Sequence, residues 1–282
     1  MLKHSMARLL NLGMFVGLLT CNMTACAATP TSGVNEALVQ EENTQNVSIE
    51  DILPTPNVNY DIFTKEEKTE KTYKVGWTTD KVNVRKKPSD RAGIIGTYPF
   101  NKKIKYEKYN KKWVKVTYKK KEGYVSKSFI KNKKIKSKTY KVPKNNGYKC
   151  GEYYTAITCP SSPQYRLQRE YAYTGSYGIR MVNGRYCVAI GSYFNCHIGQ
   201  YFTLVLKNGT KIECIKGDEK ADCDTDYRNI FSGNGCMSEF LITRDLVKKA
   251  RLMGDVSYCT DKWRSPVVKL IVYKKNVLKG GR

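Results

Sequence analysis

Histidine is nearly missing from this 282-residue chain, which contains only two. His4 lies close to the first residue, so His197 is the sole imidazole in the rest of the sequence, and no two cysteines stand in C-x-x-C spacing. Structural zinc sites take four ligands from cysteine and histidine at short spacings. The sequence therefore predicts no metal and no cofactor.

Long apolar runs are also few, and the main one is "LLNLGMFVGLLT" (9–20). It is shorter than the roughly 20 residues that a membrane-spanning helix needs. Lys3 and Arg8 precede the run and the small residues "ACA" follow it, which predicts an export signal over 1–28. Cys26 lies in "MTAC", which resembles a bacterial lipobox. Lipid-free release and lipidation at Cys26 both stay open, and a membrane partner is expected only with the lipid.

Acidic residues are scarce: 25 Asp and Glu stand against 50 Lys and Arg, for a formal net charge of +25. The exception is 29–70, which is acidic up to residue 64, has few apolar residues and is predicted to be a disordered spacer. Most of the positive charge lies in 65–149, with 28 basic and 7 acidic residues. The last part of that segment, 133–149, is predicted to be a basic linker because Lys, Asn, Gly and Pro oppose compact structure.

Such basicity raises the possibility of nucleic acid. No zinc-finger, helix-turn-helix or aromatic RNA-binding signature occurs, and an exported chain meets little intracellular nucleic acid, so none is expected as a partner. Peptidoglycan and teichoic acid are anionic polymers of the bacterial wall, and they are the predicted partners. Simple solubility remains the alternative explanation of the charge.

The cysteines are concentrated in one part of the chain. Eight of the ten lie at Cys150, Cys159, Cys187, Cys196, Cys214, Cys223, Cys236 and Cys259. An even number in an exported segment predicts disulfides. Three pairs are separated by nine residues, which suggests local bridges, but eight cysteines allow 105 pairings and the sequence does not choose among them.

Residues 73–132 alternate apolar and polar side chains in short runs separated by turn signals, which predicts a small barrel. The runs "VNVRKKPS", "IIGTYPFNKKIK", "KKWVKVTY" and "KEGYVSKSFI" match the pattern of the bacterial SH3-like domain, which this segment resembles. Asn101 stands where that family usually has a turn glycine, and asparagine also accepts the left-handed backbone.

The resemblance implies binding to cell wall, with aromatic faces at Tyr109, Trp113 and Tyr124 for sugars or stem peptide and Arg85 for a carboxylate. Trp113 and Tyr124 are expected in the barrel core, because buried aromatic residues supply much of the area of a small core. Tyr109 is therefore the preferred ligand contact.

Residues 150–276 are predicted to form a second, cysteine-rich β domain. "YFTLVL" and "TKIECI" flank Asn208-Gly209, a strong hairpin signal. "CMSEFLI" (236–242) and "PVVKLIVY" (266–273) are further strands. One short helix is expected from Arg244, capped by Thr243, to Gly254.

The order "CVAIGS", "CHIGQYFTL", "IKGDEKAD", "SEFLI" resembles the double-psi β-barrel of the 3D and rare-lipoprotein-A-like families. The resemblance implies lytic activity on wall glycan, with Asp218 and Glu239 as its acids. Asp222 could help to keep Asp218 protonated, because crowded carboxylates raise a pKa. The sequence departs from the family pattern at Gly191, where an Asp is usual.

Other interpretations of this half stay open. Asp222 and the acids of the following loop fit a merely solvated loop, and calcium is disfavoured by the EF-hand spacing rule. A cysteine peptidase would need His197, and "SGNGC" (232–236) is loosely similar to a transpeptidase motif. The sequence therefore predicts a mainly β, exported envelope protein with a small SH3-like barrel and a disulfide-rich double-psi-like barrel. It either cleaves peptidoglycan strands as a glycosidase or transglycosylase, or is a non-catalytic wall-binding, adhesin or assembly module.

Overall fold

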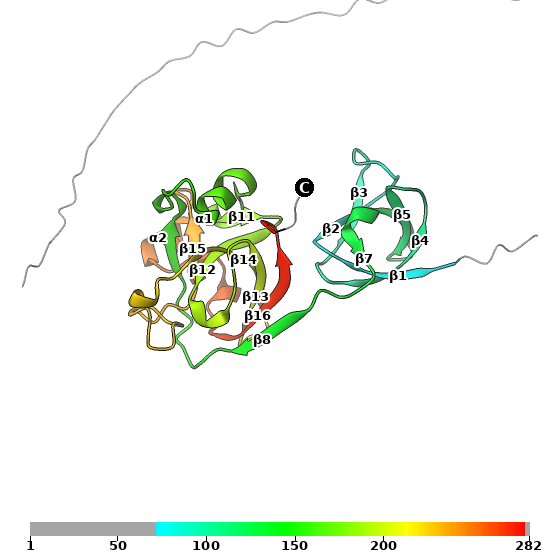
Figure 1. Cartoon of the computed structure of the whole chain (residues 1–282). Helices are drawn as coiled ribbons and strands as arrows, with labels where there is room; N and C mark the ends of the chain where they lie inside the picture. The colour runs from blue at the N-terminus through cyan, green and yellow to red at the C-terminus, as the bar shows by residue number, and fades with distance from the viewer. Residues whose placement is uncertain (1–71, 280–282) are drawn as a thin grey trace, which may run out of the picture. The chain divides into compact units, whose positions relative to one another are not determined.

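The computed structural model describes residues 72–279, and these residues are mainly β structure in two sheets (Figure 1). The predicted export signal, Cys26 and the acidic spacer lie outside the described residues. Within 72–279, none of the helices has the length and apolarity needed to cross a bilayer.

The first sheet is the predicted small barrel, with strand order β3-β2-β6-β5-β4-β1-β7. Its strands are β1 (Lys74–Thr78), β2 (Val82–Arg85), β3 (Ile94–Tyr98), β4 (Lys103–Lys108), β5 (Trp113–Tyr118), β6 (Lys121–Ser126) and β7 (Ile130–Lys131). The alternation of the sequence sends Val82, Val84, Ile104, Val114, Val116 and Val125 into one buried cluster. Asn101 has a φ of 60° at the turn before β4, so asparagine does take the left-handed place of glycine.

The second sheet has the order β10-β11-β12-β14-β13-β16-β8, and β15 joins it by pairing with β12 and β9. Its strands are β8 (Ser137–Lys141), β9 (Cys150–Tyr153), β10 (Tyr173–Thr174), β11 (Arg180–Val182), β12 (Arg185–Ile190), β13 (Gln200–Leu206), β14 (Lys211–Glu219), β15 (Glu239–Ile242) and β16 (Val267–Asn276). The predicted hairpin at Asn208-Gly209 is confirmed, since β13 and β14 pair antiparallel around it.

Two features of this sheet differ from the sequence predictions. The segment predicted as a linker contains β8, which pairs antiparallel with β16 from Ser137 to Lys141. This lysine-rich strand lies at the edge of the sheet, where charged side chains are common. The predicted helix begins at Lys248 instead of Arg244, although Gly254 ends it with a φ of 61° as expected. The assignment to the double-psi family stays a prediction.

Helical segments are short. The α-helices are α1 (Pro163–Arg166) and α2 (Lys248–Met253), and a π-helical turn, Leu167–Tyr171, continues α1. The 3-10 turns are Lys127–Phe129, Tyr154–Ala156, Ser176–Gly178, Ser192–Phe194, Asp222–Asp224, Val256–Cys259 and Asp261–Trp263. Only α2 was expected; α1 has no apolar period long enough to signal a helix.

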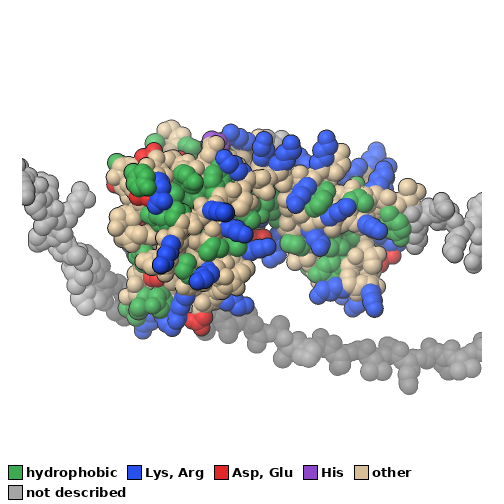
Figure 2. All heavy atoms as spheres, turned by 90° about the horizontal axis from the view of Figure 1, so that it is seen from below, with side chains coloured by type: hydrophobic (Ala, Val, Ile, Leu, Met, Phe, Trp, Pro, Cys, Tyr) green, Lys and Arg blue, Asp and Glu red, His purple; other side chains and the backbone are tan. Residues whose placement is uncertain are grey.

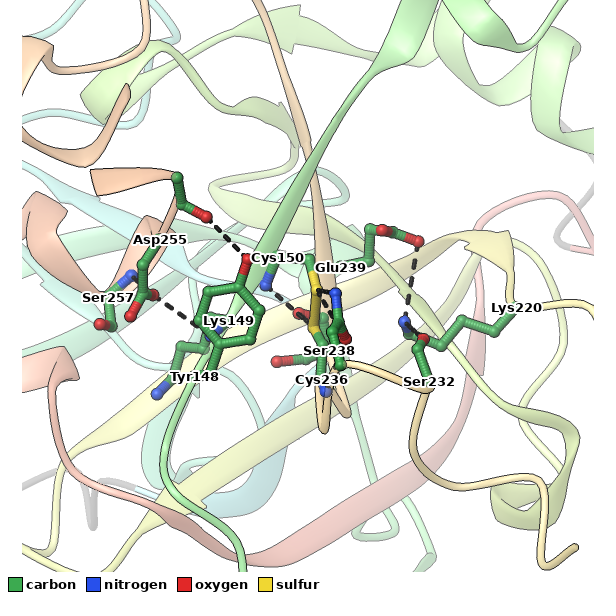
Figure 3. The surroundings of a disulfide bond; sticks show 12 residues. Tyr148, Lys149, Cys150, Lys220, Ser232, Cys236, Ser238, Glu239, Asp255 and Ser257 are labelled. Carbon is green, nitrogen blue, oxygen red and sulfur yellow. Dashed lines mark hydrogen bonds and ion pairs between the residues drawn. A yellow bond between two sulfur atoms is a disulfide. The ribbon is translucent and has the colours of Figure 1, made fainter. Parts of the chain in front are cut away.

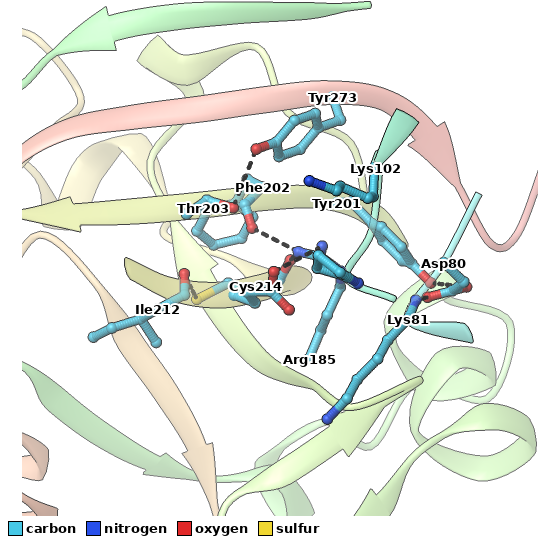
Figure 4. Close-up of polar contacts among 12 residues, drawn as sticks. Asp80, Lys81, Lys102, Arg185, Tyr201, Phe202, Thr203, Ile212, Cys214 and Tyr273 are labelled. Carbon is cyan, nitrogen blue, oxygen red and sulfur yellow. Dashed lines mark hydrogen bonds and ion pairs between the residues drawn. The ribbon is translucent and has the colours of Figure 1, made fainter. Parts of the chain in front are cut away.

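Asp80 connects the turn after β1 to the second sheet (Figure 4). Tyr201 donates its hydroxyl to Asp80 Oδ2 at 2.8 Å, and the Asn183 amide donates to the same oxygen at 3.3 Å. Phe100 packs edge-on against Tyr201, and the buried Arg185 guanidinium lies 4.7 Å and 4.4 Å from the two ring centroids. Burial raises the pKa of Asp80.

Candidate functional site

The predicted aromatic contacts of the barrel have different surroundings. Trp113, at the start of β5, is buried, as expected for a core residue. Tyr109 is 51% exposed and packs edge-on against the half-buried Tyr124, with ring centroids 5.0 Å apart. Tyr109 and Tyr124 therefore form an accessible aromatic pair.

Trp113 also borders a hollow of about 580 Å³, whose other lining residues are Asp90, Lys111, Lys112, Ser126, Lys127, Ser128 and Ile130. A ligand in this hollow would meet one edge of the indole and three lysines. Arg85 is held elsewhere, because its Nη1 donates to the backbone carbonyl of Ala92 at 2.7 Å. Arg85 thus anchors the loop between β2 and β3.

A larger groove of about 610 Å³ runs over β4 and β5. Its lining residues are Tyr73, Tyr98, Lys103, Ile104, Lys105, Glu107, Lys115, Val116, Thr117, Lys120 and Glu122. Lys103 and Lys105 point outward because they alternate with the buried Ile104. No sequence motif marks this groove, because its lysines are single residues that alternate with core positions.

Lysine and arginine side chains cover much of the face shown in Figure 2, and acidic side chains are sparse on it. Within the groove, Lys115 is paired with Glu122 at 2.6 Å. Lys103, Lys105 and Lys120 are exposed. The groove therefore offers cationic groups to an anionic ligand.

In the second sheet, Asp218 and Glu239 are paired with the same residue of the strand between them. Ala189 of β12 is the register partner of Asp218 on the parallel strand β14 and of Glu239 on the antiparallel strand β15. Register partners point to the same face of a sheet, and two strand spacings separate the outer Cα atoms by roughly 10 Å. The structure thus brings together the two acids that the sequence singled out.

Burial is the largest cause that raises the pKa of Asp218. Gln164 of α1 donates to Asp218 Oδ1 at 3.3 Å, and this contact acts in the opposite direction. The acid whose charge helps to raise this pKa is Glu219, next in sequence. Asp222, which was predicted to have that effect, is exposed and accepts a hydrogen bond from Ser192 at 2.7 Å. A role of Asp222 in keeping Asp218 protonated stays a prediction.

Glu239 has a cationic neighbour, Lys220, whose Nζ lies 3.8 Å from Glu239 Oε2 (Figure 3). The Lys220 side chain is buried and also donates to Ser232 Oγ. Burial is the main cause that lowers the pKa of Lys220. Ser232 begins the "SGNGC" motif, but nothing in the sequence indicates its contact with Lys220.

Glu152 of β9 is a third acid of this cluster. Its register partner is Leu241, two residues beyond Glu239 on β15. Burial raises the pKa of Glu152, and the charges of Glu239 and Asp218 raise it further. We call Glu152, Asp218, Glu239, Lys220 and Ser232 the strand-end cluster.

One disulfide supports the strand-end cluster. Cys150 on β9 is bonded to Cys236, which follows the turn that contains Ser232 (Figure 3). The bridge spans 86 residues, so the nine-residue local pairing suggested for Cys150 is wrong: strand register brought distant cysteines together. The other six are free thiols here, at Cys159, Cys187, Cys196, Cys214, Cys223 and Cys259. Their predicted bridges are therefore not formed in this structure.

The acidic loop after β14 makes structural contacts. Asp226 Oδ1 accepts from the backbone amides of Ile230 and Phe231 at 2.8 and 3.1 Å, which holds the loop closed. Asp224 is exposed. Within 72–279, no group of three or more His, Cys, Asp or Glu side chains is placed to hold a metal ion.

His197, the sole imidazole among residues 72–279, is not arranged for thiol chemistry. Cys196 is buried, and burial raises the pKa of its thiol to about 12. His197 is exposed. A thiolate nucleophile needs a lowered pKa and an adjacent base, and Cys196 has neither.

Comparison with known families supports the first domain. A family model described as the bacterial SH3 domain matches residues 80–131. This segment contains β2 to β7, so the predicted resemblance is confirmed for the barrel. No curated protein matches the chain.

Proposed function

We propose that this chain is an exported protein of the bacterial envelope that binds an anionic wall polymer, peptidoglycan or teichoic acid, through its SH3 barrel. The observation that carries the proposal is the lysine-lined groove on a domain that matches the bacterial SH3 family. Phosphates or stem-peptide carboxylates would lie against Lys103, Lys105 and Lys120, and sugar rings against Tyr109. The apolar run after Lys3 and Arg8 supports export, with membrane attachment only through a lipid on Cys26.

A salt-dependent sedimentation experiment tests this function. Purified chain is mixed with isolated sacculi that either retain teichoic acid or have been stripped of it. Exchanging Lys103, Lys105 and Lys120 for Gln removes three exposed charges, so we expect weaker sedimentation and a shallower loss of binding with added salt. The matched control exchanges Lys207, Lys248 and Lys262 of the second domain. Equal loss in both triple variants would show nonspecific charge attraction and contradict a site on the barrel.

A second function, cleavage of the wall glycan, is favoured by the shared register of Asp218 and Glu239 at Ala189. A glycosidase needs one carboxyl that donates a proton and a second that stays ionised. Burial favours the protonated form of Asp218, and the Lys220 ammonium lies 3.8 Å from the carboxylate of Glu239.

Release of soluble muropeptides from sacculi tests the second function. D218N should abolish release, whereas D222N should leave it unchanged because Asp222 lies on the exposed loop. If the unaltered chain binds sacculi but releases no muropeptides, the second function is contradicted and the chain is a non-catalytic wall-binding module.

A further inference from the structure

Ser232 and Lys220 meet the first geometric requirement of a serine nucleophile with a lysine base. The Lys220 ammonium is within hydrogen-bond distance of Ser232 Oγ, and the lysine side chain is only 3% exposed (Figure 3). Serine hydroxyls become nucleophilic when an adjacent base can take their proton. A lysine serves as that base when its neutral form is populated, which burial promotes.

The surroundings of Lys220 hold the amine in place. Glu239 on β15 lies 3.8 Å from Nζ and is its second side-chain partner besides the serine. The other charged groups that act on Lys220 are Glu152 on β9 and Asp224 in the 3-10 turn after β14. Because all three are acids, they oppose the effect of burial, and the net direction of the lysine pKa is still downward.

The turn after Ser232 provides space and backbone hydrogen-bond donors for the carbonyl group of a substrate. The backbone amides of Gly233 and Asn234 make no hydrogen bond with any of the described residues. A Cβ built on Gly233 would meet no atom within 4 Å, so the backbone there is open to solvent. Two adjacent amides beside a nucleophile can stabilise the oxyanion of an acyl-transfer intermediate. The bridge from Cys236 to Cys150 fixes the end of this turn to β9.

We propose that Ser232 and Lys220 form an acyl-transfer site, with Ser232 as nucleophile, Lys220 as general base and Glu239 as a positioning residue. The acidic side chains around it select the substrate. Glu239, Glu152 and Asp224 all act on the one ammonium of Lys220, so a substrate with a positive charge near the scissile carbonyl is favoured. The substrate class is an aminoacyl ester or amide, with its free ammonium against Glu152.

The reaction needs no redox partner. Neutral Lys220 Nζ takes the proton of Ser232 Oγ, and Oγ forms a bond to the acyl carbon. The carbon–oxygen or carbon–nitrogen bond to the leaving group breaks, and the leaving group takes the proton from Nζ. Water then attacks the acyl-serine, its proton passes through Lys220 to Oγ, and the free amino acid is released.

Labelling of the full chain with a fluorophosphonate tests the nucleophile. We expect one phosphonyl adduct on the peptide that contains Ser232, none on that peptide in S232A, and unchanged labelling in S161A, whose exposed serine lies outside the cluster. K220M should slow labelling by about 10²-fold, the low end for loss of a general base. Circular dichroism and the intact Cys150–Cys236 peptide show that each variant is folded. No adduct at Ser232, or equal labelling of folded K220M, would overturn the proposal.

Two further measurements test the positioning residue and the substrate class. Because Glu239 favours the charged lysine, E239Q should move the pH profile of labelling to lower pH; an unmoved profile would remove its role. Alanine p-nitrophenyl ester should be hydrolysed faster than p-nitrophenyl acetate, and E152Q should abolish the difference. Equal rates in the unaltered chain would refute the aminoacyl class. The site does not depend on wall binding: S232A should lose labelling and still sediment with sacculi, so failure of this proposal and failure of the proposed wall binding are distinguishable.

Discussion

Lys149 Nζ donates a hydrogen bond to the carbonyl oxygen of Trp263 at 2.7 Å, across 114 residues of sequence. The same ammonium donates to the carbonyls of Gly147 at 2.7 Å and Ser265 at 3.2 Å. Burial lowers the pKa of this fully buried lysine to about 8. A residue predicted to end a linker therefore fastens the entry of β9 to the segment before β16.

Replacement of Lys149 by Met should destabilise the second domain, because three buried carbonyl oxygens lose their donor. A buried acceptor left without a partner costs about 1–3 kcal/mol. Urea unfolding is expected to show a loss of about 3 kcal/mol in the free energy of unfolding. K262M is the matched control, because Lys262 is exposed, and its unfolding should be unchanged. An equal midpoint for K149M and the unaltered chain would contradict the role of the ammonium.

The pairing of Cys150 with Cys236 predicts the result of peptide mapping. Digestion without reductant should release one cross-linked peptide pair, and the other six cysteines of 72–279 should be alkylated in denaturant. Replacing both bridged cysteines by serine should lower the free energy of unfolding by about 2–4 kcal/mol. Cross-linked peptides that join Cys187, Cys196 or Cys214 would show that the buried thiols are oxidised and contradict this pattern.

The raised pKa of Asp80 predicts that the free energy of unfolding depends on pH. Its folded pKa is raised above 3.8 by burial, so the folded state holds the proton more tightly than the unfolded state. Stability from this group is therefore present at low pH and is lost as pH rises from about 3.8 through the folded pKa. The difference between the unaltered chain and D80N, measured by thermal unfolding at several pH values, should follow this sign. Exposed Asp90 provides D90N as a control that should follow the unaltered chain.

Substitutions of Trp113 and Tyr109 should distinguish an effect on the stability of the barrel from an effect on ligand binding. W113A removes a buried indole and is expected to cost about 3–5 kcal/mol. Y109A removes a half-exposed ring and should leave the unfolding midpoint within about 0.5 kcal/mol while reducing retention on sacculi. A strongly destabilised Y109A would place Tyr109 in the core and remove it as a ligand contact.

The barrel could be predicted closely because its information is local. Each strand or turn is specified within a few residues, as by the alternation around Val82 and Val84, the turn at Asn101 and the apolar run at Trp113. The family match over 80–131 agrees with that reasoning. The hairpin at Asn208-Gly209 was predictable for the same reason, since turn chemistry fixes the register of its two strands.

The strand-end cluster was predictable only in part. Asp218 and Glu239 were named from a resemblance, but their shared partner Ala189 depends on β12 lying between β14 and β15. The departure at Gly191 also has a tertiary cause: a Cβ there would collide with the backbone carbonyl of Asn229. Glycine is required at this position by a chain segment 38 residues away, which no local pattern indicates.

By itself, the sequence determined the class of the fold, the place of the barrel and the concentration of positive charge, because alternation, turn residues and composition act over short distances. Tertiary structure alone decided which cysteine meets Cys150, that the lysine-rich linker supplies β8, and that Ser232 reaches Lys220. The first two contacts join segments far apart in the chain, and they depend on the packing of the whole domain. Ser232 and Lys220 are 12 residues apart, and the path of the loop between them brings them together.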